Sequence, residues 1–201
     1  MPYMDEEIAK MLRKERMKEK EKQQQQEIEQ EKEKINEEQL AEEMEKGVCF
    51  LFDRSFRFSQ KIIMNKRLKV YIPDKKLEIK YNFQELFVAG ENAYSFGLNY
   101  ALAEDGTPIQ PWNTYKKNMQ DGMKEVNMKF KWIEEGCVLN QENQLHYMEF
   151  LSLTGLGTIH NHMYMADTKY GRLTINLNYL HEEERYWRPL VQVMIKKMEV
   201  L

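Results

Sequence analysis

The fold of this chain is decided by residues 170–198, YGRLTINLNYLHEEERYWRPLVQVMIKKM. In the first half, apolar residues occupy every second position: Leu173, Ile175, Leu177 and Tyr179. This alternation predicts a strand with one buried face. In the second half, apolar residues recur at the spacing of one helical face: Trp187, Leu190, Val191, Met194, Ile195 and Met198. This stripe predicts a terminal amphipathic helix, and Pro189 fits near its start because the first turn has no hydrogen bond to lose.

Toward the N-terminus, the alternation of apolar and polar residues recurs in several segments. It predicts strands at Leu68–Pro73, Leu77–Tyr81, Asn92–Ala103, Phe130–Trp132, Leu145–Leu153 and Thr158–Ala166. Asp105–Gly106 is typical of a turn, and Asp167–Gly171 of a hairpin loop.

One segment between these strands has a helical period instead. Pro111 suits the first position of a helix, and apolar residues follow on one face: Trp112, Tyr115, Met119, Met123 and Val126. Short turns between alternating strands predict a mainly antiparallel sheet. With helices packed on that sheet, the expected fold class is α+β.

The composition changes abruptly at Lys46–Gly47. Residues 1–46 hold 10 of the 30 Lys and Arg and 15 of the 33 Asp and Glu, whereas residues 47–201 hold all three Trp and all nine Phe. Glu, Lys, Gln and Met all favour helices. The sequence therefore predicts a charged, long polar N-terminal helix over residues 1–46, partly disordered, followed by one α+β domain over residues 47–201.

Apolar residues are sparse in the predicted arm. One short stripe stands out: Met4, Ile8, Met11 and Leu12. It is the expected contact site for a protein partner that would order the arm. Ile28 and Ile35 are one heptad apart, but Glu42 takes the next position, so the pattern does not predict a sustained coiled coil. A structural homo-oligomer formed through the arm stays open as an alternative.

Several bulk properties exclude other classes of protein. The net charge is −3, and neither part is basic enough to favour nucleic acid as a partner. The start, MPYMDEEIAK, is acidic where a signal peptide would be basic, and no apolar run approaches the ~20 residues that span a bilayer. Cys49 and Cys137 are expected to be buried, unpaired thiols. Together these properties favour a cytoplasmic protein.

The histidines are the main candidates for chemistry. His160 and His162 stand two apart on a predicted strand, so both side chains point to the same face. His146 or Glu149, on the preceding predicted strand, could add a third metal ligand. Hydrogen-bonded histidines on a sheet are the simpler interpretation. Because no catalytic, cofactor or phosphate-binding pattern occurs elsewhere, no cofactor is expected and a binding protein is favoured over an enzyme.

Parts of the sequence also resemble the PsbP/DcrB-like superfamily of small α/β/α sandwich domains. The matching parts are the proline-ended strand Leu68–Pro73, the strand Asn92–Ala103 with the helix Trp112–Val126, and the ending that runs from Tyr170 to Pro189 and the terminal helix. The resemblance covers residues 54–201 and implies the sandwich fold, with no catalytic residues to carry over. Members include photosystem accessory subunits, a nuclear-import cofactor, envelope lipoproteins and cytoplasmic chaperones of secreted effectors.

We therefore expect a non-catalytic cytoplasmic binding module, or a chaperone-like adaptor, that holds another polypeptide on its sheet or on the edge of that sheet. The 14 Met residues support this expectation, because Met-rich apolar surfaces adapt to different partners. The alternative from another class is a metal-binding protein or enzyme centred on His160, His162 and His146.

Overall fold

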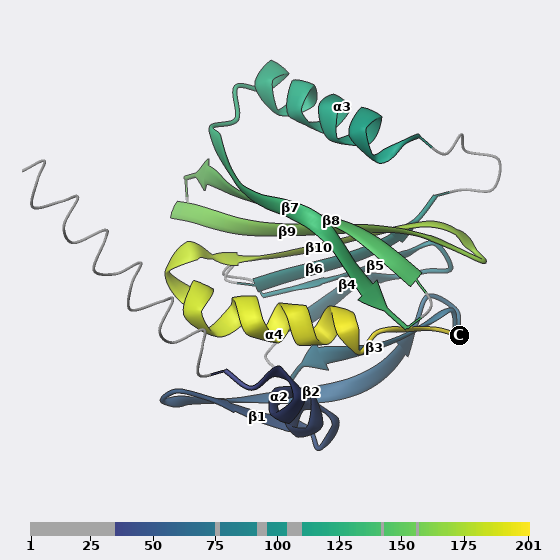
Figure 1. Ribbon diagram of the computed structural model, residues 1–201, viewed down its shortest axis with the longest axis vertical. Helices are drawn as coiled ribbons and strands as arrows, with labels where there is room; N and C mark the ends of the chain where they lie inside the picture. Colours follow the sequence, from purple (N-terminus) through teal and green to yellow (C-terminus); the bar gives the residue numbers. More distant parts are fainter. Residues whose placement is uncertain (1–34, 75–76, 92–95, 104–109, 142, 156) are drawn as a thin grey trace, which may run out of the picture. The chain divides into compact units, whose positions relative to one another are not determined.

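The computed structural model describes residues 35–74, 77–91, 96–103, 110–141, 143–155 and 157–201 (Figure 1). The chain divides into two units, Met1–Glu37 and Glu38–Leu201. The contact stripe expected at Met4, Ile8, Met11 and Leu12 lies outside the described residues, as does nearly all of the arm. The helix expected there therefore stays a prediction.

Seven strands of the second unit form one antiparallel sheet, in the order β4-β5-β6-β10-β9-β8-β7. Their bounds are β4 Glu78–Asn82, β5 Leu86–Gly90, β6 Phe96–Leu102, β7 Phe130–Asn140, β8 Asn143–Thr154, β9 Gly157–Thr168 and β10 Gly171–Leu180. The predicted hairpin between β9 and β10 is present. Gly171 closes it at a φ of 108°, a left-handed conformation that glycine adopts without strain.

A second, four-stranded sheet has the order β1-β2-β3-β11. Its strands are β1 Val48–Leu51, β2 Arg54–Ile63, β3 Leu68–Pro73 and β11 Glu199–Val200. Of these, only β3 was predicted from the sequence. β11 brings the end of the chain beside β3, where Lys69 Nζ donates to Glu199 Oε1 at 2.6 Å.

The terminal helix α4 (Glu184–Lys196) follows a single 3-10 turn, His181–Glu183, and lies between the two sheets (Figure 1). The predicted stripe is buried, although its last residue, Met198, follows the end of the helix. The buried face of α4 is wider than expected, since seven of its side chains are buried: Tyr186, Trp187, Leu190, Val191, Val193, Met194 and Ile195. A helix covered on two sides needs apolar residues on both. Pro189 lies in its second turn, later than the sequence suggested.

A short helix, α2 (Glu37–Glu45), precedes β1. Within the second unit, Leu40 and Met44 are buried, and Glu43 Oε2 accepts a hydrogen bond of 2.8 Å from the backbone N–H of Phe50. Glu45 Oε1 lies 2.6 Å from Lys197 Nζ. The second unit therefore begins some residues before the composition change at Gly47.

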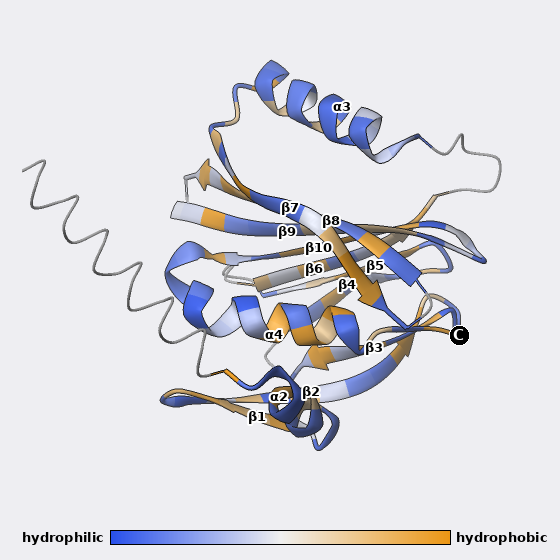
Figure 2. Ribbon diagram, in the orientation of Figure 1, coloured by the Kyte–Doolittle hydropathy of each residue, from blue (hydrophilic) through white to orange (hydrophobic). Residues whose placement is uncertain are grey.

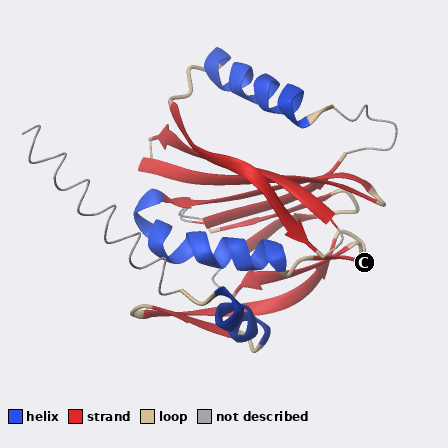
Figure 3. Cartoon of the chain, viewed as in Figure 1, coloured by secondary structure: helices blue, strands red, loops and turns tan. Residues whose placement is uncertain are grey.

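Helix α3 (Trp112–Glu125) lies on the opposite side of the large sheet from α4 (Figures 1 and 3). Its Tyr115 hydroxyl is 3.5 Å from Met163 Sδ on β9, and Lys116 Nζ is 2.7 Å from Glu135 Oε2 on β7. No residue of α3 is fully buried, and most of its length is hydrophilic (Figure 2). Val126, expected on its apolar face, is 69% exposed, so α3 covers the sheet only loosely.

The large sheet therefore has two unlike faces. We call the side that α4 covers the inner face and the opposite side the outer face. On β10 the inner residues are Leu173, Ile175, Leu177 and Tyr179, and the outer ones are Thr174, Asn176 and Asn178. On β9 the inner residues are His160, His162 and Tyr164, and the outer ones are Asn161 and Met163. The predicted class, an α+β fold with mainly antiparallel sheets flanked by helices, is confirmed.

Candidate functional site

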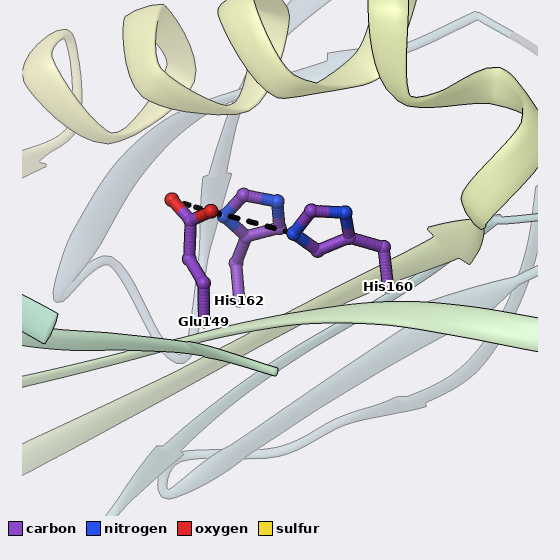
Figure 4. Close-up of side chains that lie close together, drawn as sticks. All are labelled: Glu149, His160 and His162. Atoms are coloured by element: carbon purple, nitrogen blue, oxygen red, sulfur yellow. Dashed lines mark hydrogen bonds and ion pairs between the residues drawn. The ribbon is translucent and has the colours of Figure 1, made fainter. Parts of the chain in front are cut away.

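A cluster of ionisable side chains lies on the inner face (Figure 4). Glu149 on β8 pairs across the strands with His162 on β9, and His160 precedes His162 by two residues. Glu149 Oε2 lies 3.3 Å from His160 Nε2, and Glu149 Oε1 lies 3.3 Å from His162 Nδ1. The two rings are stacked with centroids 4.6 Å apart. All three side chains are buried, so each polar group depends on a partner within the protein.

Helix α4 supplies the positive charge. Arg188 Nη2 lies 3.0 Å from Glu149 Oε2 and donates to Glu134 Oε2 at 2.6 Å. Arg188 Nη1 lies 3.6 Å from Glu184 Oε1. A planar guanidinium suits this bridging role because it has several donors in fixed directions. We call Glu149, His160, His162 and Arg188 the inner cluster.

The protonation of the inner cluster follows from burial and pairing. Burial alone would raise the pKa of the Glu149 carboxyl group. Hydrogen bonds with His160 and His162, together with neighbouring positive charge, instead lower this pKa well below its usual range. Burial lowers the pKa of His162, so this ring is neutral near pH 7. Neither of these two groups titrates near neutral pH, where a general acid or base works best.

The three candidate histidines lie on two different faces. His146 is on the outer face, where its ring stacks on Trp112 at a centroid distance of 5.4 Å and its Nδ1 is 3.1 Å from Cys137 Sγ. His146 and Glu149 are three residues apart on β8 and so point to opposite sides of the sheet. His160 and His162 therefore meet Glu149, the other third ligand considered from the sequence, and not His146.

The two cysteines also differ in their surroundings. Both are free. Cys49 is buried as predicted, and burial raises the pKa of its thiol to about 12. The prediction of a buried thiol is wrong for Cys137, which is exposed because β7 is an edge strand of the large sheet.

The outer face carries a pocket of about 460 Å³ over β5, β6, β10, β9 and β8. The strand register places two rows of its lining residues across the sheet. One row is Val88, Asn99, Asn176 and Met163, and the other is Gly90, Gly97, Asn178, Asn161 and Phe150. We call this cavity the asparagine pocket. Helix α3 does not contribute to its lining.

The asparagines of this pocket are only partly satisfied within the protein. Asn161 Nδ2 donates to Ser152 Oγ at 2.9 Å, but Asn99 Oδ1 is buried and has no hydrogen-bond partner. Gly97 leaves room for Asn178, because a Cβ at residue 97 would lie 2.5 Å from Asn178 Oδ1. A buried acceptor without a donor costs about 1–3 kcal/mol. The carboxamide groups that line the pocket offer both donors and acceptors to a ligand.

Sequence reasoning missed the asparagine pocket. The signal was present in the polar positions between the apolar ones, such as Asn176 and Asn178 in the run NLN. Polar residues at alternate positions are also typical of an ordinary strand that exposes one face to solvent, so the pattern does not indicate a pocket. Only the strand order shows that asparagines from β6, β9 and β10 lie together.

No protein-family model matches the sequence, and no curated protein does. Among solved structures, cyanobacterial PsbP (CyanoP) from Synechocystis matches with a TM-score of 0.54 at 9% identity, over 72% of this chain and 92% of that chain. The fold is PsbP-like. This confirms the sandwich that the sequence resemblance implied. A protein of unknown function from Pseudomonas aeruginosa matches with a TM-score of 0.45 at 10% identity, over 70% of this chain and 94% of that chain.

The PsbP-like architecture does not itself assign a site, since one fold supports many functions. Among the described residues, none of the helices combines the length and the apolar character that crossing a lipid bilayer requires. The asparagine pocket and the inner cluster are therefore the two features from which a function can be argued.

Proposed function

We propose that this protein is a non-catalytic cytoplasmic binding module that holds an extended segment of another polypeptide in the asparagine pocket. The observation that carries the proposal is the floor of four asparagines in a pocket to which α3 contributes no lining residue. The inner face cannot serve in this way because α4 covers it.

The chemistry of the floor matches a peptide main chain. A carboxamide offers one acceptor and an NH₂ donor group, which are the same kinds of group that a peptide bond presents. Asn99 lies opposite Asn176, and Asn178 lies opposite Asn161, so donors and acceptors come in neighbouring pairs. Five strands at about 4.8 Å spacing span roughly 19 Å, the length of about six extended residues.

Apolar groups border the asparagines. Phe150 stacks on Trp132 with ring centroids 5.8 Å apart and planes 10° apart, while Val88 and Met163 lie farther along the same pocket. Aromatic rings and Met suit the apolar side chains of a bound segment. The asparagines carry no charge, and the two charged lining residues, Lys80 and Glu91, have opposite signs, so we expect salt to affect binding little.

The N-terminal arm is proposed as a second, weaker contact. Its stripe of Met4, Ile8, Met11 and Leu12 offers a narrow apolar face on an otherwise charged segment. In the full-length chain, replacing Ile8 and Leu12 by Ser should weaken partner binding by a modest factor. If that change abolished binding, the arm would be the main recognition element.

Selection of random peptides displayed on phage by the full-length protein tests the proposal. We expect enrichment of extended peptides with apolar residues at intervals, and synthetic copies should bind the wild type. The double variant Asn99→Ala/Asn176→Ala should bind these copies about tenfold more weakly. That loss corresponds to about 1.4 kcal/mol, within the range for one or two net hydrogen bonds.

A matched control lies on α3, where Asn113 and Asn118 are exposed and outside the pocket. The variant Asn113→Ala/Asn118→Ala should bind as the wild type does. An absence of enriched peptides would refute the proposal. So would peptides that bind the pocket variant undiminished, which would point to another surface such as the exposed edge strand β4 with Ile79 and Tyr81.

A further inference from the structure

Two histidines near the start of α4 have a buried ring nitrogen without a hydrogen bond of good geometry, namely Nδ1 of His160 and Nδ1 of His181. The Nδ1 of His162 differs from them, because it lies 3.3 Å from Glu149 Oε1 within the inner cluster. Buried polar atoms are nearly always paired in folded proteins, so two such nitrogens in one region call for a common explanation. His160 is the central one, because its side chain is fully buried.

The partner of His160 Nε2 determines whether His160 Nδ1 carries a proton or a free lone pair. His160 Nε2 lies 3.3 Å from Glu149 Oε2. A carboxylate only accepts hydrogen bonds, so in the neutral ring Nε2 carries the proton and Nδ1 carries a free lone pair. Metal-binding histidines have this arrangement, with one nitrogen on the metal and the other N–H on a carboxylate that orients the ring.

The free lone pair of His160 is directed to the region where β9 and β10 meet the start of α4. There Glu184 Oε1 lies 3.9 Å from His160 Nδ1, and Glu184 Oε2 lies 3.3 Å from His181 Nδ1. All three ligand atoms lie within 4.8 Å of one another. Ligands at about 2.0–2.2 Å from a tetrahedral zinc ion are roughly 3.4 Å apart, so small side-chain movements suffice to close the site.

We propose that His160 Nδ1, His181 Nδ1 and the Glu184 carboxylate bind a divalent transition-metal ion of the zinc class, with Glu149 orienting His160. Two nitrogens and one carboxylate oxygen are donors that zinc takes, and a fourth position is left for water. The site lies close to the surface, since the His181 side chain is 41% exposed.

The other possible set, Glu149, His160 and His162, fits a metal ion less well. Its three residues are all buried, and Glu149 pairs with Arg188 at 3.0 Å, whereas Glu184 lies farther from Arg188, at 3.6 Å. His162 Nε2 is also engaged, at 2.7 Å from the Tyr179 hydroxyl. A metal ion there would displace the guanidinium that neutralises Glu149.

The local charge also favours a cation. Glu134, Glu149 and Glu184 surround Arg188, so these four groups carry two more negative charges than positive ones. A divalent ion at the proposed site would balance them.

The site is tested by isothermal titration calorimetry, in which ZnCl₂ is added to the full-length protein after EDTA treatment and dialysis. CoCl₂ in place of zinc adds a visible absorption that reports tetrahedral nitrogen and oxygen ligands. We expect one ion per chain. His181→Ala should weaken zinc binding about tenfold or more, and Glu184→Gln should do the same while keeping the shape of the side chain. His146→Ala, which removes the histidine of the outer face, is the matched control and should bind as the wild type does.

Circular dichroism of each variant establishes that it is folded. If either His181→Ala or Glu184→Gln perturbs α4, the other variant still tests the site. The proposal is overturned if the wild type binds no stoichiometric zinc or cobalt. It is also overturned if His146→Ala loses as much affinity as His181→Ala. Loss of binding in His162→Ala with none in His181→Ala would place the metal in the other set and refute this site.

Discussion

The two faces of the seven-stranded sheet come from the same strands but differ in every respect that matters for function. On the inner face, alternate residues of β10 are buried against α4, and the charged inner cluster is paired with Arg188. On the outer face, the intervening residues of β10 include Asn176 and Asn178, and α3 covers part of the sheet without burying any of its own residues. The inner side is closed by the packing of α4, and the outer side carries a pocket lined by asparagine side chains.

This difference indicates how one strand can serve stability and binding at the same time. Because side chains alternate, Leu177 and Asn176 are neighbours in sequence but lie on opposite faces. Changes on the inner face should therefore reduce the free energy of unfolding, and changes on the outer face should reduce binding alone.

The largest effect is expected from Arg188→Met. Met keeps most of the aliphatic volume but leaves the Glu149 carboxylate, 2% exposed, without its guanidinium. Removing one partner of a buried ion pair costs about 3–5 kcal/mol. Urea unfolding in the presence of EDTA measures the loss. The double variant Arg188→Met/Glu149→Gln should recover part of it, and a loss below about 1 kcal/mol in the single variant would mean that the pair is not buried in solution.

A loss of similar or slightly smaller size is expected from Leu190→Ala. Leu190 is fully buried on α4 between the two sheets, and truncating a buried Leu costs about 2–5 kcal/mol. Leu139→Ala on β7 is the matched control, since this side chain is 74% exposed. If both variants unfolded at the same urea concentration as the wild type, α4 would not be a core element.

The smallest effect is expected from Asn176→Ala. This change lies on the outer face and removes no packed apolar group, so the free energy of unfolding should stay within about 0.5 kcal/mol of the wild type. The adjacent Leu177→Ala should cost about 2–5 kcal/mol. Equal losses in the two variants, measured by urea unfolding, would show that the faces do not differ as described.

The parts of the fold that could be predicted are those with a clear local period. The alternation at Leu173–Tyr179 gave β10, and the stripe from Trp187 gave α4. β2 was missed because only Phe56, Phe58 and Ile63 of its ten residues are buried, with no regular alternation between them. In α2, Leu40 and Met44 are two apolar positions in a charged segment, and their burial depends on tertiary contacts.

The candidate sites could be predicted only where they rest on one strand. Period two places His160 and His162 on one face, and Glu149 was a candidate third ligand from the neighbouring strand. The contribution of Arg188 depends on how α4 crosses the sheet, which no local pattern specifies. The asparagine pocket depends on β10 inserting between β6 and β9, because that strand order brings Asn99 opposite Asn176.

The claim that the outer face is the binding surface is tested most directly by nuclear magnetic resonance. Full-length protein labelled with nitrogen-15 is titrated with a selected peptide, and the side-chain amide signals are followed. We expect the largest chemical-shift changes for the side-chain amides of the pocket asparagines: Asn99, Asn161, Asn176 and Asn178. The indole signal of Trp187, buried on the inner side, should not move. Unchanged asparagine signals, with shifts confined to Trp187 or to the backbone of β4, would show that the outer face is not the binding surface.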